Sequence, residues 1–178
     1  MNHNFFNLCV GSSVVFRSVL YSYPVRVVFR KDVDIPMLGV SHKAGTEIEV
    51  PLYLALKLEE MGAVEIDDRN VIQPKDVTSL KYVEQRESYP VKLPDGFYPR
   101  VKLTIYMLNK KGDAKAVRTI LQDVRELVME RVRKMAVLLA TRPDAINDQS
   151  LLERLTPEER ALLLSMYTSI SSFTLSIT

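Results

Sequence analysis

The sequence has few of the residues that most often carry metal or redox chemistry. Its 178 residues include one cysteine, Cys9, two histidines, His3 and His42, and no tryptophan. A lone cysteine cannot form an intrachain disulfide, so the fold does not depend on an oxidising compartment and we expect an intracellular protein. A structural zinc ion usually takes four cysteine or histidine ligands, and three such residues are too few. We therefore expect no metal site and no cofactor.

A strong charge of one sign is also missing. The chain has 24 basic and 22 acidic residues, a net charge of +2 and a pI near 8.6. Proteins that bind by neutralising many phosphates usually have a clustered basic face and a higher pI. The two parts of the chain differ in charge. Residues 1–74 hold seven basic and nine acidic residues, whereas residues 75–178 hold 17 basic and 13 acidic residues. We therefore expect DNA to be bound at most weakly, through the second half.

No apolar run is long enough to span a bilayer. Residues 1–23 form an apolar stretch, but it lacks a basic start and Arg17 interrupts it, so a signal peptide or membrane anchor is not favoured. We predict an N-terminal extension over residues 1–23 that is mobile or adds a strand. No membrane partner is expected.

Motifs for catalysis are missing as well. Gly39 and Gly45 are isolated, and no glycine-rich loop followed by Lys and Ser or Thr occurs, so nucleotide hydrolysis is not expected. Neither histidine stands in a recognisable pattern with a nucleophile and an orienting acid. Adjacent carboxylates at positions 59–60 and 67–68 fit a solvated helix and a turn better than an acid–base pair. The sequence therefore favours a protein that is not an enzyme.

Residues 24–178 divide into two segments with different residue patterns. Residues 24–74 alternate β-branched and polar residues, which predicts strands over 25–30 and 47–50, a helix over 52–61 ended by Gly62, and a hairpin from 63–66 and 71–72. Residues 75–178 have helical spacing. The fold class is therefore α+β, with a small N-terminal β-rich domain (24–74) followed by an all-α helical bundle domain (75–178).

The helices expected in the second half are bounded by clear signals. Asp113 is a suitable N-cap for a helix that continues to about residue 141, and Asp144 is a suitable N-cap for a shorter helix that ends at Leu155. Thr156 and Glu159 form a capping box for a last helix that continues to about residue 172. Further helices are expected over 76–87 and 96–109. The tail 173–177 alternates with period two, which favours a short strand or a frayed end.

The long helix carries an apolar stripe over about seven turns, more than the core of a 100-residue domain needs, so part of the stripe is expected to face another chain. Arg131 lies at the edge of that stripe, which predicts a buried or interfacial ion pair. Glu130 and Lys134 are spaced for an exposed i,i+4 pair, and with Arg125 and Arg133 they are typical of a solvated, salt-bridged face. The aromatic residues nearby are assigned to core or interface rather than to stacked bases: Tyr89, Phe97, Tyr98 and Tyr106.

Four segments resemble, in order, parts of the GINS family. Residues 25–66 are similar to its small β-rich B domain, and Leu93-Pro94-Asp95-Gly96-Phe97-Tyr98 is similar to the start of a helix in its A domain. Residues 130–136 resemble its long helix with arginine and lysine, and Leu155-Thr156-Pro157-Glu158-Glu159 resembles the start of its last helix. The sequence departs from the family at Gly96, where a polar residue is more usual, at Tyr53, where Trp is common, and over residues 1–23.

The resemblance implies a non-enzymatic scaffold of DNA replication. The order B domain then A domain resembles the archaeal subunit related to the second and third eukaryotic partners, which pairs with a sister subunit of opposite domain order in a two-plus-two tetramer. The implied partners are that sister subunit, the MCM helicase and a RecJ-like nuclease homologue. The implied location is the cytoplasm, near the nucleoid during replication.

Pattern and resemblance together give two sets of candidate contact residues. The candidates for the A-domain core and subunit interface are Phe97, Tyr98, Arg131, Met135, Leu162, Tyr167 and Ile170. Those for a B-domain contact are Tyr53, Lys57 and Glu60. The alternative from a different class is a nucleic-acid-binding protein that uses a basic helical face or the small β module, and the net charge of +4 over residues 75–178 permits weak, salt-sensitive binding.

Overall fold

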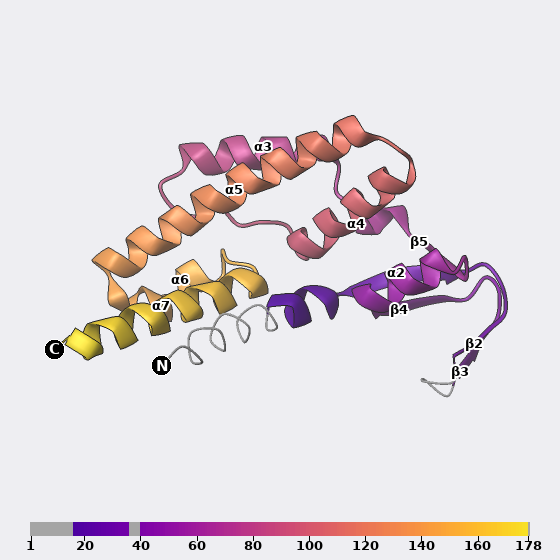
Figure 1. Ribbon diagram of the computed structural model, residues 1–178, viewed down its shortest axis with the longest axis horizontal. Coiled ribbons are helices and arrows are strands. Elements are labelled where there is room, and N and C mark those ends of the chain that lie inside the picture. Colours follow the sequence, from indigo (N-terminus) through magenta and orange to yellow (C-terminus); the bar gives the residue numbers. More distant parts are fainter. Residues whose placement is uncertain (1–15, 36–39, 178) are drawn as a thin grey trace, which may run out of the picture.

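A β-rich part is followed by a bundle of helices, which confirms the predicted fold class. The computed structural model describes residues 16–35 and 40–177, so His3, Cys9 and Gly39 lie outside the described residues. Figure 1 shows the strands at one end of the molecule and the carboxyl end of the last helix, α7 (Pro157–Ile177), at the other. Residues 16–21 of the expected extension are helical rather than a strand, and Tyr21 and Tyr23 pack against the β-rich part.

The β-rich part is built on a three-stranded antiparallel sheet of order β4-β1-β5. The strands are β1 (Pro24–Phe29), β4 (Glu47–Pro51) and β5 (Val64–Ile66), with Val25 opposite Val50 and Phe29 opposite Val64. Alternation along β1 buries Val25, Val27 and Phe29 on one face, as a half-buried strand requires. Strands β2 (Val33–Ile35) and β3 (Val40–His42) form a separate antiparallel pair.

Helix α2 (Leu52–Glu60) covers the sheet with Leu52, Ala55 and Leu58. Gly62 ends it as predicted, since its φ is +63° and its N–H donates to the Glu59 carbonyl. The predicted hairpin after it is wrong, because β5 pairs with β1. Residues Asp68–Asn70 form a short 3₁₀ helix, η2, in which the Asp67 carboxylate accepts from the Arg69 N–H.

The other helices make up the bundle: α3 (Pro74–Arg86), α4 (Phe97–Lys110), α5 (Ala114–Thr141), the 3₁₀ turn η3 (Pro143–Asn147), α6 (Gln149–Leu152) and α7. The Asp113 carboxylate caps α5 as predicted, accepting from the Ala116 N–H at 2.9 Å. Asp148, not Asp144, caps the short helix, because its carboxylate accepts from the N–H groups of Ser150 and Leu151.

The expected strand or frayed end over 173–177 is wrong, since α7 continues through Ile177. Hydroxyl groups along this helix donate to carbonyl oxygens three or four residues earlier, as Thr168 does to Leu164 and Ser176 to Phe173. These bonds satisfy the hydroxyls inside the helix, so the alternating apolar and polar residues do not need a strand partner.

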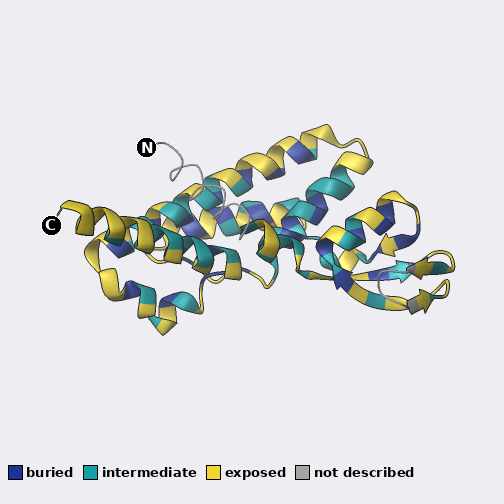
Figure 2. Cartoon of the chain, turned by 60° about the horizontal axis from the view of Figure 1, so that its bottom comes forward, coloured by how far each residue is buried: buried dark blue, intermediate teal, exposed yellow. Residues whose placement is uncertain are grey.

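Three apolar clusters hold the described residues together. The first lies in the β-rich part and includes Leu103 from α4. The second joins α3, α4 and the first half of α5, and the third joins the end of α5 to η3, α6 and α7 around Met135 and Leu163. The far end of the long stripe on α5 is therefore covered by this chain's own helices. Figure 2 shows buried positions running along α5, with exposed positions on its outer face.

Candidate protein-binding site

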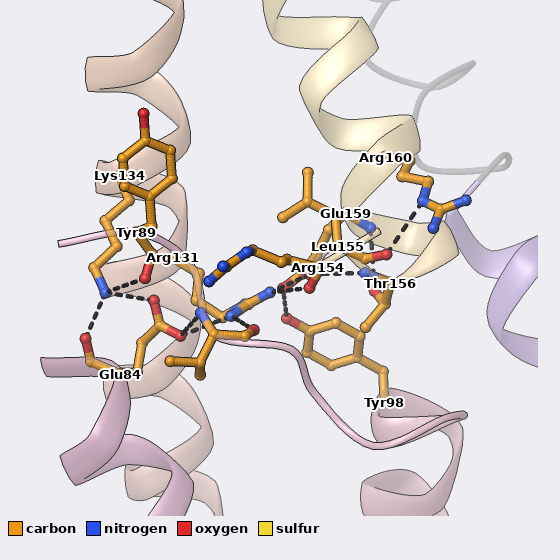
Figure 3. A network of polar contacts seen from close by, with 11 residues as sticks. Glu84, Tyr89, Tyr98, Arg131, Lys134, Arg154, Leu155, Thr156, Glu159 and Arg160 are labelled. Carbon is orange, nitrogen blue, oxygen red and sulfur yellow. Dashed lines mark hydrogen bonds and ion pairs between the residues drawn. The ribbon is translucent and has the colours of Figure 1, made fainter. Parts of the chain in front are cut away.

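Arg131 is fully buried at the centre of the bundle and forms the ion pairs that its place beside the apolar stripe predicted. Its Nε donates to Glu159 Oε1 at 2.5 Å and its Nη2 to Glu159 Oε2 at 2.7 Å. Its Nη1 donates to Glu84 Oε2 and to the Val91 carbonyl, each at 2.7 Å, and its Nη2 donates to the Arg154 carbonyl at 3.2 Å. Such a planar, forked donor is the group that satisfies two carboxylates at once. Figure 3 shows the guanidinium between α3 and α7.

Lys134 is buried beside Arg131, so the predicted exposed pair between Glu130 and Lys134 is wrong. The Lys134 ammonium donates to Glu84 Oε1 at 2.6 Å and also contacts the Glu84 carbonyl. Glu130 instead pairs with Arg133 on the outer face at 2.5 Å. The spacing explains this, because position 134 is two turns after the buried Leu127 and therefore on the inner face of α5.

The capping box predicted at the start of α7 is confirmed, and it is part of the same network. The Thr156 N–H donates to Glu159 Oε2 at 3.0 Å, and the Glu159 N–H donates to Thr156 Oγ1 at 3.3 Å. The Tyr98 hydroxyl from α4 donates to Glu159 Oε1 at 2.6 Å. One carboxylate thus receives bonds from α4, from α5 and from its own helix start, which fixes the direction in which α7 leaves the bundle.

The network is electrically balanced, with two cations, Arg131 and Lys134, facing two carboxylates, Glu84 and Glu159. Burial alone would lower the pKa of Arg131, but the hydrogen bonds and charge of Glu159 and the charge of Glu84 raise it above its usual range. Burial, with the charge of Glu159, raises the pKa of Tyr98 well above its ordinary value. The raised pKa values keep Arg131 charged and Tyr98 protonated at neutral pH, so these two donors suit a fixed support rather than proton transfer.

An open groove of about 700 Å³ lies beside this support, between α4, α5 and α7. Most of its lining side chains are apolar or aromatic, and the helical residues that precede β1 complete its wall. Leu121 on α5 is 49% exposed there. The lining residues are Phe16, Arg17, Leu20, Leu56, Tyr98, Val101, Lys102, Ile105, Tyr106, Asn109, Leu121, Val128, Glu158, Glu159 and Leu162. A concave, mainly apolar surface with a few charges at its edge is typical of a site for another protein's side chains.

The bundle residues named from the sequence divide between core and surface. Phe97 and Met135 are fully buried, in the second and third clusters, and the Phe97 ring meets the Tyr98 ring edge to face at 5.2 Å. Leu162 and Tyr167 are partly buried against the third cluster, and Ile170 is 46% exposed on α7. Tyr98 and Leu162 are the two that also line the groove.

The candidate contact residues of the β-rich part lie together on the outer face of α2. Tyr53 is 51% exposed, and Lys57 and Glu60 are exposed and form an ion pair at 2.8 Å. Hydrogen bonding to Glu60 raises the pKa of Lys57. None of these three side chains contributes to the hydrogen bonds described for the buried network, so they form a separate surface.

Sequence reasoning missed the contacts that join the β-rich part to the bundle. Glu59 at the end of α2 is buried and accepts from the Tyr106 hydroxyl and the Lys110 ammonium of α4. The Tyr23 ring lies where a Cβ on Gly96 would be, and Gly96 has a φ of +64°. This explains why glycine stands there in place of a polar residue. The positive φ and the close approach leave no local sequence pattern beyond the glycine itself.

The described residues contain no group of three or more histidine, cysteine, aspartate or glutamate side chains arranged to hold a metal ion. None of the helices within 16–35 and 40–177 is both long and apolar enough to cross a membrane.

Residues 71–178 match the family model of Sld5, described as a GINS complex protein helical bundle domain. The match covers more than half of the chain and spans the whole bundle with its buried network. A comparison with curated proteins finds no match. Members of the matched family are non-catalytic subunits of a complex that acts in DNA replication. The chain therefore belongs to the GINS family.

Proposed function

We propose that this chain is a non-catalytic GINS subunit of the archaeal type, with B domain 24–74 and A domain 75–178, which binds a sister subunit of opposite domain order in a two-plus-two tetramer. The carrying observation is the groove between α4, α5 and α7, whose apolar lining the described residues leave open. An amphipathic helix of the sister subunit fits its shape, and Lys102 and Glu158 at the groove offer both signs of charge to the edges of such a helix.

Co-expression with the sister subunit tests this proposal. The Leu121→Glu chain should lose sister binding by at least tenfold, because a carboxylate would enter the apolar groove. Met129→Glu is the matched control, since Met129 lies on the same helix, is 61% exposed and does not line the groove. Equal binding by both variants, or no sister binding by the unaltered chain, would count against the proposal.

The wider role proposed is to connect the MCM helicase and a RecJ-like nuclease homologue in the cytoplasm, near the nucleoid. The exposed face of α2, with Tyr53, Lys57 and Glu60, is the proposed B-domain contact for one of them. Binding assays that compare Tyr53→Ala with the unaltered chain, run with each purified partner, identify which of the two partners contacts α2. Retention of both interactions by this variant would remove α2 from the proposal.

Direct nucleic-acid binding is the alternative, and the net charge of +4 over residues 75–178 is its support. A DNA titration at two salt concentrations separates the two functions, because phosphate contacts weaken steeply with salt. Tight binding by the lone chain at physiological salt would favour the alternative.

A further inference from the structure

A short helix that precedes β1 forms one edge of the groove between α4, α5 and α7. Residues 16–21 are helical, and Phe16, Arg17 and Leu20 line the groove. Phe16 and Leu20 are half-buried and stand four residues apart, so they share one face of this helix. Figure 1 shows the helix beside the start of α7. Residues 16–20 are called the strap from here on.

The residues that follow the strap are firmly attached. Tyr21 and Tyr23 pack against the core of the β-rich part, and the Tyr23 carbonyl accepts from the Leu52 N–H at 2.9 Å. The Lys102 ammonium of α4 lies over the Tyr21 ring, 5.4 Å from the ring centroid. These two tyrosines are therefore a fixed point from which the strap extends.

The strap itself has a weaker attachment. Within the described residues, no side chain of the strap forms a hydrogen bond or an ion pair, so Phe16 and Leu20 hold it against the groove by apolar contact. A helix of so few residues is not stable alone in water. Its helical form depends on the surface that it lies on, and loss of this contact would release the strap while β1 stays folded.

The contact is of the kind that a bound partner helix makes. An amphipathic helix binds an apolar groove through side chains at positions i and i+4, and Phe16 and Leu20 have this spacing. The strap thus covers one edge of the groove in the way expected of the end of the sister subunit's helix. A longer helix buries more apolar surface than these two side chains do, and it would replace them.

We propose that the strap is a displaceable cover, which closes one edge of the groove in the lone chain and turns outward about Tyr21 and Tyr23 when the sister subunit's helix enters. This regulation rests on the proposed function, because it concerns the same groove. The strap lowers the apparent affinity for the sister subunit, because only the fraction of chains with an open groove can bind it.

Sister binding by strap variants tests the proposal. Leu20→Ala and Phe16→Ala/Leu20→Ala should bind the sister subunit more tightly, by about threefold or more, because alanine preserves the helix but removes the side chains that hold the groove closed. Val19→Ala is the matched control, since Val19 lies on the same helix, is also half-buried and does not line the groove. Its affinity should equal that of the unaltered chain.

Amide hydrogen exchange in the lone chain is the second measurement. The strap should exchange faster than β1 in the unaltered chain and faster still in Leu20→Ala, whereas exchange in β1 should stay unchanged. Exchange of the strap and of β1 at one common rate would mean that the strap opens only when the fold opens, and this result would overturn the proposal.

Weaker sister binding by Leu20→Ala would make the strap a part of the sister's binding surface and would overturn the proposal too. Equal binding by the Leu20 and Val19 variants would have the same consequence. Absence of sister binding by the unaltered chain is instead a failure of the proposed function, and exchange in the lone chain still decides whether the strap opens.

Discussion

Arg131 on α5 and Glu159 on α7 meet through two parallel hydrogen bonds, at 2.5 and 2.7 Å, although 28 positions separate them in the chain. Both side chains are almost completely shielded from water. The same glutamate forms the capping box with Thr156. The start of the last helix is therefore attached to the middle of the longest one.

Replacing Arg131 with Met should destabilise the fold by about 3–5 kcal/mol, because Glu159 would lose its buried cation and Glu84 would keep only Lys134. Urea unfolding measures this loss. Arg133→Met is the control, since Arg133 pairs with Glu130 on the exposed face of the same helix and should cost under about 1 kcal/mol. Similar losses for both variants would show that the buried network does not hold the bundle together.

Gly96→Ala should loosen the β-rich part from the bundle. An added methyl group would overlap the Tyr23 ring and would also strain a backbone with positive φ. Gly62→Ala has the same strain, with a φ of +63°, but meets no atom within 4 Å, so it should cost about 1 kcal/mol and leave the contact intact. Thermal melting of the two single variants and of the double variant Gly96→Ala/Tyr23→Ala separates the steric overlap with the Tyr23 ring from the backbone strain. The double variant should recover part of the loss.

Asp123 predicts a loss of stability in acid. Burial would raise its pKa, but hydrogen bonds from Lys81 at 2.6 Å and Thr78 at 2.5 Å lower it below 3.8. A lowered pKa means that the stabilisation is complete above the ordinary value and is lost as the pH falls through the folded one. Asp123→Asn should therefore be less stable than the unaltered chain by about 1–3 kcal/mol at pH 7. Melting curves of the two proteins should converge as the pH falls below the ordinary aspartate range and through the lowered pKa of the folded state.

Tyr106→Phe tests the junction at Glu59. Losing one of the two side-chain bonds to this buried carboxylate should speed amide exchange in α2 and β4 relative to the bundle. Lys57→Met, which removes the exposed pair with Glu60 on the same helix, is the control and should leave exchange unchanged. Equal exchange in both variants would mean that Glu59 does not hold α2 against α4.

The elements that could be predicted from the sequence are those fixed by local chemistry. Gly62, Asp113 and Thr156 each act within one turn of their own helix, so spacing alone identified them. Arg131 was predicted because a charge beside an apolar stripe has to find a partner. Its partners, Glu84 and Glu159, come from other helices, and no local pattern names them.

The failures have the same cause. The i,i+4 spacing from Glu130 predicts an exposed ion pair for Lys134, but packing against α3 places its ammonium against Glu84 instead. The predicted hairpin is wrong because the backbone N–H and carbonyl of Ile72 bond to the Thr104 hydroxyl on α4 instead of to a strand. The groove depends on the relative positions of three helices and of residues 16–20, which single-sequence periodicity cannot supply.

Leu103 belongs to α4 by its place in the chain, but it is fully buried in the core of the β-rich part. Truncating the chain after residue 74 would therefore remove Leu103 and leave a cavity in the core of the β-rich part. Heat should melt the two parts together in one transition, because neither can lose its structure without exposing the other's apolar surface. Through this one leucine, a force applied to the strands is passed directly to a helix of the bundle.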